Sequence, residues 1–228
     1  MKKRLIITAI IFFLAFITLM VFCILIYKNE NDPLSFDIWA RDLAYNTRGE
    51  KSGFWYYFWR ILTEVGDKFF FAVLLILLLF YTKLDYRFLI FALGMILEAL
   101  LNGAFKGVYQ RERPNSSLWW VYESTTSFPS GHSTGAGFVY SYLIFIFAIT
   151  ENNKKIKIPV IIVSALFMLL VPLSRIVLGM HYLSDCIAGL SLGVLVASIL
   201  MYLTILFQEY NILQKGIINL SFKKKKTI

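Results

Sequence analysis

The sequence contains few of the residues on which soluble enzymes and metalloproteins depend. Only 16% of its 228 residues are charged, and there are two histidines and two cysteines. A hydrophobic fraction of 58% excludes an ordinary soluble domain. Cys23 and Cys186 both fall inside long apolar runs, so we predict buried free thiols and no disulfide. Two histidines are too few for a metal centre built from several imidazoles.

Long apolar runs dominate what is present. A transmembrane helix needs about 20 predominantly apolar residues. Six runs fit or approach that length: Leu5–Tyr27, Phe69–Thr82 (short, and expected to extend upstream), Phe88–Phe105, Ser133–Thr150, Ile156–Val171 and Leu183–Phe207. No signal-peptide cleavage site follows the first run, so we predict an uncleaved span. The sequence therefore predicts an all-α integral membrane bundle of six transmembrane helices, forming one domain over residues 1–228.

The basic residues are distributed unevenly between the loops. Thirteen of the 23 Lys and Arg fall on one side of the predicted bundle: Lys2, Lys3, Arg4, Lys83, Arg87, Lys154, Lys155, Lys157, Lys215 and Lys223 to Lys226. Excess basic charge marks the cytoplasmic face, so we predict a multi-pass cell-membrane protein with both termini in the cytoplasm. The basic tail, residues 208–228, would face anionic lipids, and we expect no nucleic-acid partner.

The longest polar stretch, residues 28–67, falls on the opposite, extracytoplasmic side. It closes with an aromatic cluster that starts at Phe54-Trp55-Tyr56-Tyr57. Because Trp and Tyr favour the headgroup level of a membrane, we predict a helical segment that lies in the interface. Two roles fit this segment equally well: it borders a path for lipid entry, or it anchors the bundle.

Three cations, Lys106, Arg113 and Arg175, belong to the same outer side without a matching number of carboxylates. Cations that lie close together repel, so an anion is expected among them, and Arg and Lys both bind phosphate oxygens. Ser130 and Gly131 stand at the expected start of a helix, where free amides and the helix dipole favour an anion. These residues predict a phosphate-binding site.

The two histidines lie in polar segments on this outer side. His181 and Asp185 are spaced i, i+4, so we expect them on one helix face, with the carboxylate orienting the ring and leaving its other nitrogen free to attack. His132 has no carboxylate near it in the sequence and suits a general acid. A metal site is a rival, but three cations would oppose a divalent ion. A serine hydrolase is another, but Gly-x-Ser-x-Gly is absent.

Three motifs together resemble the signature of the type 2 phosphatidic acid phosphatase superfamily: Lys106-x6-Arg113-Pro114, Pro129-Ser130-Gly131-His132 and Ser174-Arg175-x5-His181-x3-Asp185. The resemblance covers about residues 60–205. It implies a membrane lipid phosphatase in which His181 is the nucleophile, Asp185 its partner and His132 the acid and later the base. It also implies that no metal or cofactor is needed and that phosphate is held by Lys106, Arg113, Ser130, Gly131 and Arg175.

The resemblance leaves the lipid phosphate substrate open. Undecaprenyl pyrophosphate is our first expectation, and phosphatidylglycerol phosphate, or phosphatidic acid more broadly, is the alternative. A lipid phosphotransferase would use the same histidines and differ only in what removes the phosphoryl group. The non-enzyme alternative is an inactive bundle that binds phospholipids, and the intact signature argues against it.

Two further patterns lie outside the signature. Glu98, Asn102 and Lys106 are spaced by four, so they share one face of the predicted third helix. An intramembrane Glu is rarely without a role. Glu98 would contact a substrate headgroup or position Lys106, or it would be satisfied by a neighbouring helix. Gly131-x3-Gly135 and Gly189-x3-Gly193 indicate close helix contacts, with Gly131 also at the phosphate site.

Overall fold

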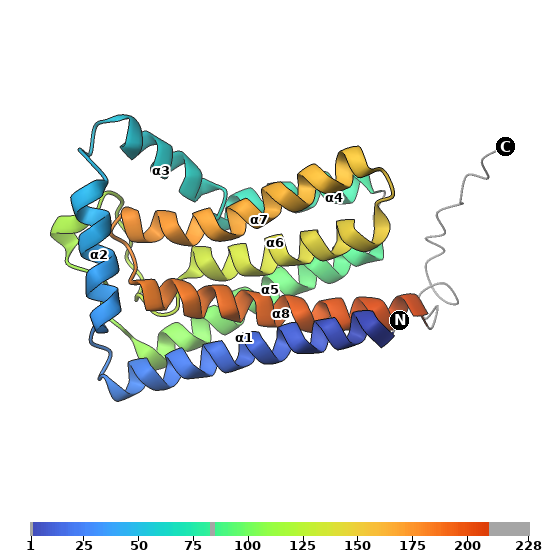
Figure 1. Cartoon of the computed structure of the whole chain (residues 1–228), viewed down its shortest axis with the longest axis horizontal. Coiled ribbons are helices and arrows are strands. Elements are labelled where there is room, and N and C mark those ends of the chain that lie inside the picture. Colours follow the sequence, from blue (N-terminus) through green and yellow to red (C-terminus); the bar gives the residue numbers. More distant parts are fainter. Residues whose placement is uncertain (1, 83–84, 210–228) are drawn as a thin grey trace.

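The described part of the chain is entirely helical. The structure, a computed structural model, describes residues 2–82 and 85–209 (Figure 1). Its helices are α1 (Lys2–Lys28), α2 (Ser35–Thr47), α3 (Phe54–Glu64), α4 (Lys68–Tyr81), α5 (Tyr86–Tyr109), the short 3-10 helix η1 (Ser116–Leu118), α6 (Gly131–Thr150), α7 (Lys154–Val177) and α8 (Leu183–Glu209). Each of the six predicted apolar runs falls within or nearly within one of these helices. The predicted basic tail, residues 208–228, lies outside the described residues beyond 209.

Five of the helices are long and apolar enough to cross a membrane: α1, α5, α6, α7 and α8. The all-α multi-pass bundle predicted from the sequence is thereby confirmed, but its count of six spans is not. Helix α4 has only 14 residues, which at about 1.5 Å per residue cover roughly 21 Å of a hydrocarbon layer about 30 Å thick. A break at Gly66 and Asp67 separates α4 from α3, so no continuous upstream extension completes the span.

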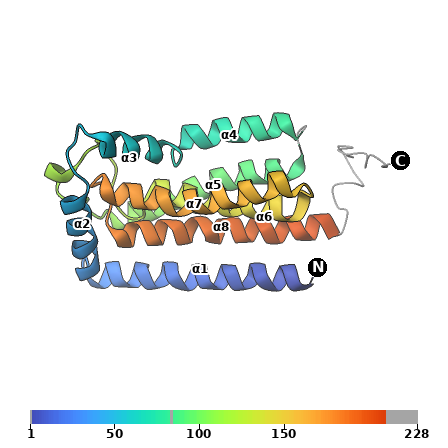
Figure 2. The ribbon, with the colours of Figure 1, turned by 45° about the horizontal axis from the view of Figure 1, so that its top comes forward.

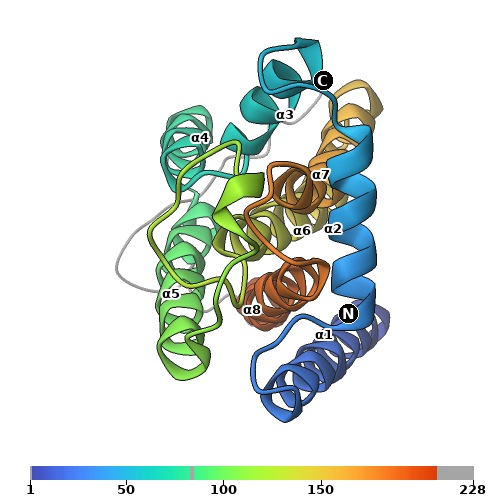
Figure 3. The ribbon, with the colours of Figure 1, turned by 90° about the vertical axis from the view of Figure 1, so that its left-hand side faces the viewer.

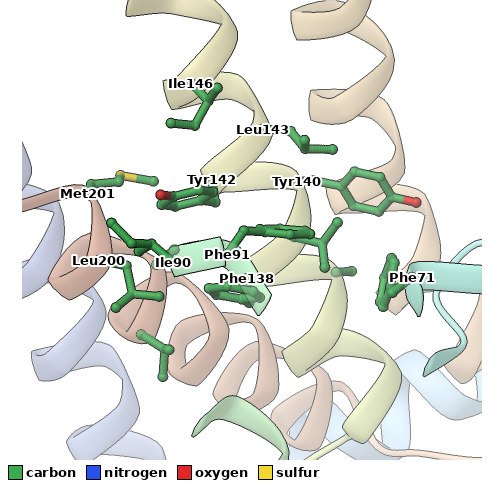
Figure 4. Packing of buried hydrophobic residues seen from close by; sticks show 14 of the residues in the cluster. Phe71, Ile90, Phe91, Phe138, Tyr140, Tyr142, Leu143, Ile146, Leu200 and Met201 are labelled. Carbon is green, nitrogen blue, oxygen red and sulfur yellow. The ribbon is translucent and has the colours of Figure 1, made fainter. Parts of the chain in front are cut away.

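Helix α6 lies at the centre of the bundle, packed against α5, α7 and α8, while α1 packs on the outer side of α8 (Figures 2 and 3). Within the apolar windows, 61% of α6 is buried but only 22% of α1, so α1 presents most of its apolar surface outward. The core between α4, α5, α6 and α8 is aromatic: Phe91 stacks on Phe138 and Tyr142 (Figure 4). The bundle therefore holds α6 rigidly and leaves α1 facing lipid.

The segment between α1 and α4 folds as two short helices at one end of the bundle. Helix α2 runs across the ends of the long helices, and α3 projects beside it (Figures 1 and 3). The exposed side chains of α3 include Phe54, Trp55, Tyr57 and Ile61. An amphipathic aromatic helix at this position matches the interfacial helical segment expected for residues 28–67.

Glycines let α6 and α8 touch backbone to backbone. A Cβ atom added at Gly193 would lie 2.0 Å from the Thr134 carbonyl oxygen, and one at Gly189 would lie 2.5 Å from the Ser130 carbonyl oxygen. Gly137 makes the reciprocal contact, with Leu190. On Gly135, the added atom would meet the Phe71 ring at 2.6 Å. The expectation of close glycine-mediated helix contacts is confirmed.

The glycine contact predicts a loss of stability in Gly193→Ala. The new methyl group meets backbone atoms that cannot move independently, so we expect a cost of about 1–3 kcal/mol. That corresponds to a fall of about 2–4 °C in Tm per kcal/mol, measured by thermal unfolding in detergent. Gly107→Ala is the matched control, because nothing lies within 4 Å of an added Cβ there. A Tm for Gly193→Ala equal to that of Gly107→Ala would contradict the close packing.

Candidate active site

A cavity of about 420 Å³ opens at the end of the bundle crossed by α2 and α3. Residues from α4, α5, α6 and three loops line it, including Lys106, Arg113, His132 and His181. Gly131 and the carboxylates of Asp67, Glu98 and Glu123 also face it. The structure thus brings together polar residues that are separated by more than 80 positions in the sequence.

His181 lies in the turn between α7 and α8, two residues before α8 begins at Leu183. The sequence placed it on a helix face with Asp185, but Gly179 adopts a positive φ of 75° and ends α7 in a tight turn. The Asp185 carboxylate instead caps the start of α8, where its Oδ2 accepts from the Tyr182 amide at 2.9 Å. The pair still comes together, with His181 Nδ1 3.6 Å from Asp185 Oδ2.

A serine bridges this pair. The 3.6 Å separation exceeds a direct hydrogen bond. Ser127 Oγ lies 3.3 Å from His181 Nδ1 and donates to Asp185 Oδ2 at 2.5 Å. Since the serine proton goes to the carboxylate, Ser127 Oγ is free to accept the Nδ1 proton. Ser127 is a site residue that sequence reasoning missed, because its loop carries no local signal for this contact.

The other ring nitrogen of His181 faces a cation. Arg113 Nη1 lies 3.1 Å from His181 Nε2, and a guanidinium can only donate. Nε2 is therefore the unprotonated nitrogen, and the ring proton is on Nδ1. Burial lowers the pKa of His181 well below its ordinary value of 6.5, and the neighbouring cations Arg113, Arg175 and Lys106 lower it further. The site thus keeps a neutral imidazole with its lone pair toward the cavity side.

His132 is the second residue of α6. Its Nε2 lies 4.0 Å from Asp67 Oδ2, a carboxylate that the sequence did not connect with it. Asp67 is the N-cap of α4, where its Oδ1 accepts from the Phe69 amide at 2.8 Å. The capping bond holds Asp67 at the mouth of the cavity, so a carboxylate accompanies each of the two histidines.

Two of the three predicted cations, Lys106 and Arg113, line the cavity, and Arg175 is not part of its lining. Lys106 Nζ donates to the Thr126 carbonyl, and Arg113 Nε donates to the Thr125 carbonyl at 2.6 Å. The side chain of Arg175 is almost fully buried; it donates to Thr63 Oγ1 at 3.0 Å and pairs with Glu123 at 3.4 Å. Its Nε has no hydrogen-bond partner among the described residues. A buried donor without an acceptor is costly, so an anion is the natural occupant.

The start of α6 supplies further donors. Ser130 is the N-cap, and its amide is occupied by the Asp185 carbonyl at 3.1 Å. Its Oγ accepts from Ser133 Oγ at 2.9 Å, which leaves the Ser130 hydroxyl hydrogen free to donate. The amides of Gly131 and His132 open the helix and have no intrahelical acceptor. The donors available to phosphate are therefore the Ser130 hydroxyl and the next two amides.

Glu98, Asn102 and Lys106 all line the cavity from α5. Asn102 Nδ2 donates to Thr134 Oγ1 at 2.9 Å and to the Pro129 carbonyl at 3.4 Å, so it ties α5 to the start of α6. Glu98 is buried and faces the cavity from deeper in the bundle. Asn102 thus supports the site through α6, and Glu98 lines the same cavity.

Sequence reasoning also missed a buried cluster behind the histidine pair. Arg111 Nη1 donates to Asp185 Oδ1 at 2.6 Å, and Arg111 Nη2 donates to Asp37 Oδ2 at 3.0 Å. Both ion pairs have fully buried side chains. Arg111 stands two residues before Arg113, and an extended chain would place both side chains on one side. Chain alternation therefore gives no signal for the separate role of Arg111, whose partners lie 74 residues away on either side in the sequence.

The comparisons with known proteins agree with this geometry. Residues 87–208 match the PAP2 superfamily, which is more than half of the chain. The chain belongs to the PAP2 superfamily. Phosphatidylglycerophosphatase B of Bacillus subtilis (strain 168) is 31% identical over 141 residues, covering 59% of this chain and 68% of the relative. Like its relatives, this chain is a lipid phosphatase of the membrane-embedded type.

Two solved structures share the fold. A transmembrane PAP2-type phosphatidylglycerolphosphate phosphatase from Bacillus subtilis matches with a TM-score of 0.72 and 26% identity, over 90% of this chain and 97% of the other. LpxE of Aquifex aeolicus matches with a TM-score of 0.60 and 20% identity, over 74% of this chain and 96% of the other. The second likeness concerns the fold alone.

The environment of His181 predicts its titration. In His132→Asn, His181 is the only histidine, so its ring signals in NMR spectra of the detergent-solubilised protein need no further assignment. We expect a midpoint below 6.5, because burial and three nearby cations oppose the imidazolium. Adding Arg113→Gln should raise the midpoint by removing a cation. A midpoint at or above 6.5, or a downward shift with Arg113→Gln, would contradict this environment.

Proposed function

We propose that this PAP2 phosphatase removes the terminal phosphate of phosphatidylglycerol phosphate through a phosphohistidine on His181. The substrate rests on the relative named phosphatidylglycerophosphatase B, 31% identical over 141 residues. The name of this relative favours phosphatidylglycerol phosphate over our first expectation from the sequence, undecaprenyl pyrophosphate. The observation that carries the mechanism is the 3.1 Å approach of Arg113 Nη1 to His181 Nε2. In this contact Nε2 is the unprotonated nitrogen, and the Arg113 guanidinium lies where it can also bind a phosphate oxygen.

The first chemical step joins the phosphoryl group to the enzyme. His181 Nε2 attacks phosphorus, the N–P bond forms, and the P–O bond to the lipid breaks. His132 protonates the departing oxygen, so the lipid leaves as an alcohol. Asp185, reached through Ser127, stabilises the positive charge on the His181 ring. In the second step, water loses a proton to His132 and attacks phosphorus, and the P–N bond breaks to release inorganic phosphate.

The surrounding donors stabilise charge on the phosphoryl oxygens. Lys106, Arg113 and Arg175 supply cations, and the Ser130 hydroxyl and the Gly131 amide supply hydrogen bonds. The same cations would repel a divalent metal, so the proposed reaction uses none. In this scheme the site is built for a phosphate group, while the lipid part is selected elsewhere in the cavity.

The orientation in the membrane is part of the proposal. The start of α1, the end of α4, the start of α5 and the α6–α7 turn lie at the end of the bundle opposite α2 and α3 (Figure 1). Lys2, Arg4, Arg87 and Lys154 belong to that far end. Since basic residues mark the cytoplasmic face, we place the termini in the cytoplasm and the active site outside.

Phosphate release from purified protein tests the function. With phosphatidylglycerol phosphate and undecaprenyl pyrophosphate at equal mole fractions in detergent micelles, we expect the higher kcat/KM for phosphatidylglycerol phosphate. His181→Asn should lose about 10³-fold or more in kcat, because no other group can form the covalent bond. EDTA should leave the activity unchanged, and vanadate should inhibit it.

Each outcome has a separate meaning. A preference for undecaprenyl pyrophosphate would overturn the substrate and leave the chemistry standing. Loss of activity in EDTA, restored by a divalent ion, would overturn the metal-free reaction. Phosphate release by His181→Asn at the rate of the unaltered protein would overturn the nucleophile. Ser198→Ala is the control variant, since this buried serine donates only within its own helix, to the Leu195 carbonyl at 2.7 Å.

A further inference from the structure

The Arg111 side chain is fully buried and uses its whole guanidinium group. Nε donates to the Asn31 carbonyl at 2.9 Å. Nη1 donates to Ser184 Oγ at 2.8 Å and to Asp185 Oδ1 at 2.6 Å, and Nη2 donates to the Asp32 carbonyl at 3.1 Å and to Asp37 Oδ2 at 3.0 Å. The guanidinium carbon also lies 4.5 Å from the centre of the Tyr182 ring. Because every guanidinium nitrogen donates a hydrogen bond, the Arg111 side chain is held in one position.

Asp37 belongs to α2, the helix that crosses the end of the bundle, and it is fully buried. Its Oδ1 accepts from the Ser184 amide at 2.8 Å, and its Oδ2 accepts from Ser184 Oγ at 2.7 Å. Asp37 therefore holds both Arg111 and the first turn of α8. One cation lies between two buried carboxylates, and removing it would leave two negative charges without compensation.

The arrangement divides the two oxygens of Asp185. Arg111 Nη1 donates to Oδ1 at 2.6 Å. Oδ2 accepts from Ser127 Oγ and from the Tyr182 amide, and it is the oxygen that faces His181 Nδ1. Because Arg111 holds Oδ1, the Asp185 carboxylate cannot rotate about its Cβ–Cγ bond, and the direction of Oδ2 is fixed. The position of the His181 ring follows from this chain of contacts.

We propose that Arg111 and Asp37 are positioning residues of the phosphatase reaction, so that the outer helix α2 forms part of the catalytic apparatus. This inference rests on the proposed role of His181 as nucleophile. Arg111 aims Asp185 Oδ2 at the Ser127–His181 pair, and Asp37 holds Arg111 in place from α2. Neither residue lines the cavity, so both act through Asp185 and leave substrate binding unchanged.

The chain offers a matched control for Arg111. Arg48 is a second buried arginine that anchors α2, at the other end of the helix. It donates to the Leu118 carbonyl at 2.8 Å and to the Val177 carbonyl at 2.9 Å, and it lies over the Trp120 ring. None of its described contacts reaches Asp185. Arg48→Lys and Arg111→Lys both keep the positive charge and lose the planar set of guanidinium donors. Only Arg111→Lys disturbs the carboxylate of Asp185.

Steady-state kinetics on phosphatidylglycerol phosphate, with Tm measured in the same detergent, separates the two roles. We expect Arg111→Lys to lower kcat about 100-fold while KM stays within about twofold, because a misplaced group costs about that much in rate. Asp37→Asn should lower kcat by about tenfold, the effect of one weakened charged hydrogen bond. Arg48→Lys should lower Tm to a similar degree as Arg111→Lys but keep kcat within about twofold of the unaltered protein.

Arg111→Lys with a kcat loss no larger than that of Arg48→Lys would overturn the inference. If Arg111→Lys does not fold, the double variant Arg111→Met with Asp37→Asn decides. It keeps the net charge of the cluster, because one cation and one anion are removed together. A kcat equal to that of the unaltered protein in that variant would overturn the inference, and a loss of about 100-fold would support it. Activity retained by His181→Asn would instead overturn the proposed function itself.

Discussion

The close contact between α6 and α8 is the constraint on which the rest of the structure depends. Gly189 and Gly193 bring α8 against the carbonyls of α6, and the Ser130 amide donates to the Asp185 carbonyl at 3.1 Å. This hydrogen bond holds the first turns of α6 and α8 side by side. His132 begins one helix and His181 precedes the other, so both histidines reach one cavity without a long ordered loop between them. Side chains larger than hydrogen at these glycines would separate the helices and the chemistry with them.

Charge is distributed in two layers around this contact. The cavity lining carries three cations, Lys68, Lys106 and Arg113, and three carboxylates, Asp67, Glu98 and Glu123. The buried Arg175 Nε lacks a partner among the described residues, which suits an anionic substrate. Behind the histidine, carboxylates are in excess: one cation, Arg111, lies between Asp37 and Asp185. In the proposed reaction, the cations at the cavity bind phosphate, and the Arg111 cluster orients the His181 imidazole that attacks it. Arg113 on one side and Ser127 with Asp185 on the other together keep the proton of the neutral His181 ring on Nδ1.

Much of this could be predicted from the sequence, because membrane spans and short motifs are local features. Apolar length identified the helices. The motifs named several residues that line the cavity, among them Lys106, His132 and His181, but Ser130, Arg175 and Asp185 are not part of its lining. Three features depended on tertiary contacts and could not be read in this way. The turn at Gly179 places His181 ahead of α8. Ser127 lies between His181 and Asp185 although 54 residues separate it from His181. Asp37 and Ser184 pair across 147 residues, where no spacing rule applies.

The account depends most directly on a covalent bond between phosphorus and His181. Rapid acid-free quenching of the enzyme with phosphatidylglycerol phosphate labelled in its terminal phosphate, followed by mass spectrometry of the peptides, locates that bond. We predict an acid-labile, alkali-stable phosphoryl group on the peptide that contains His181, present at one turnover and absent in His181→Asn. Phosphate release during a single turnover without any labelled peptide, or with the label on a different residue, would contradict the account.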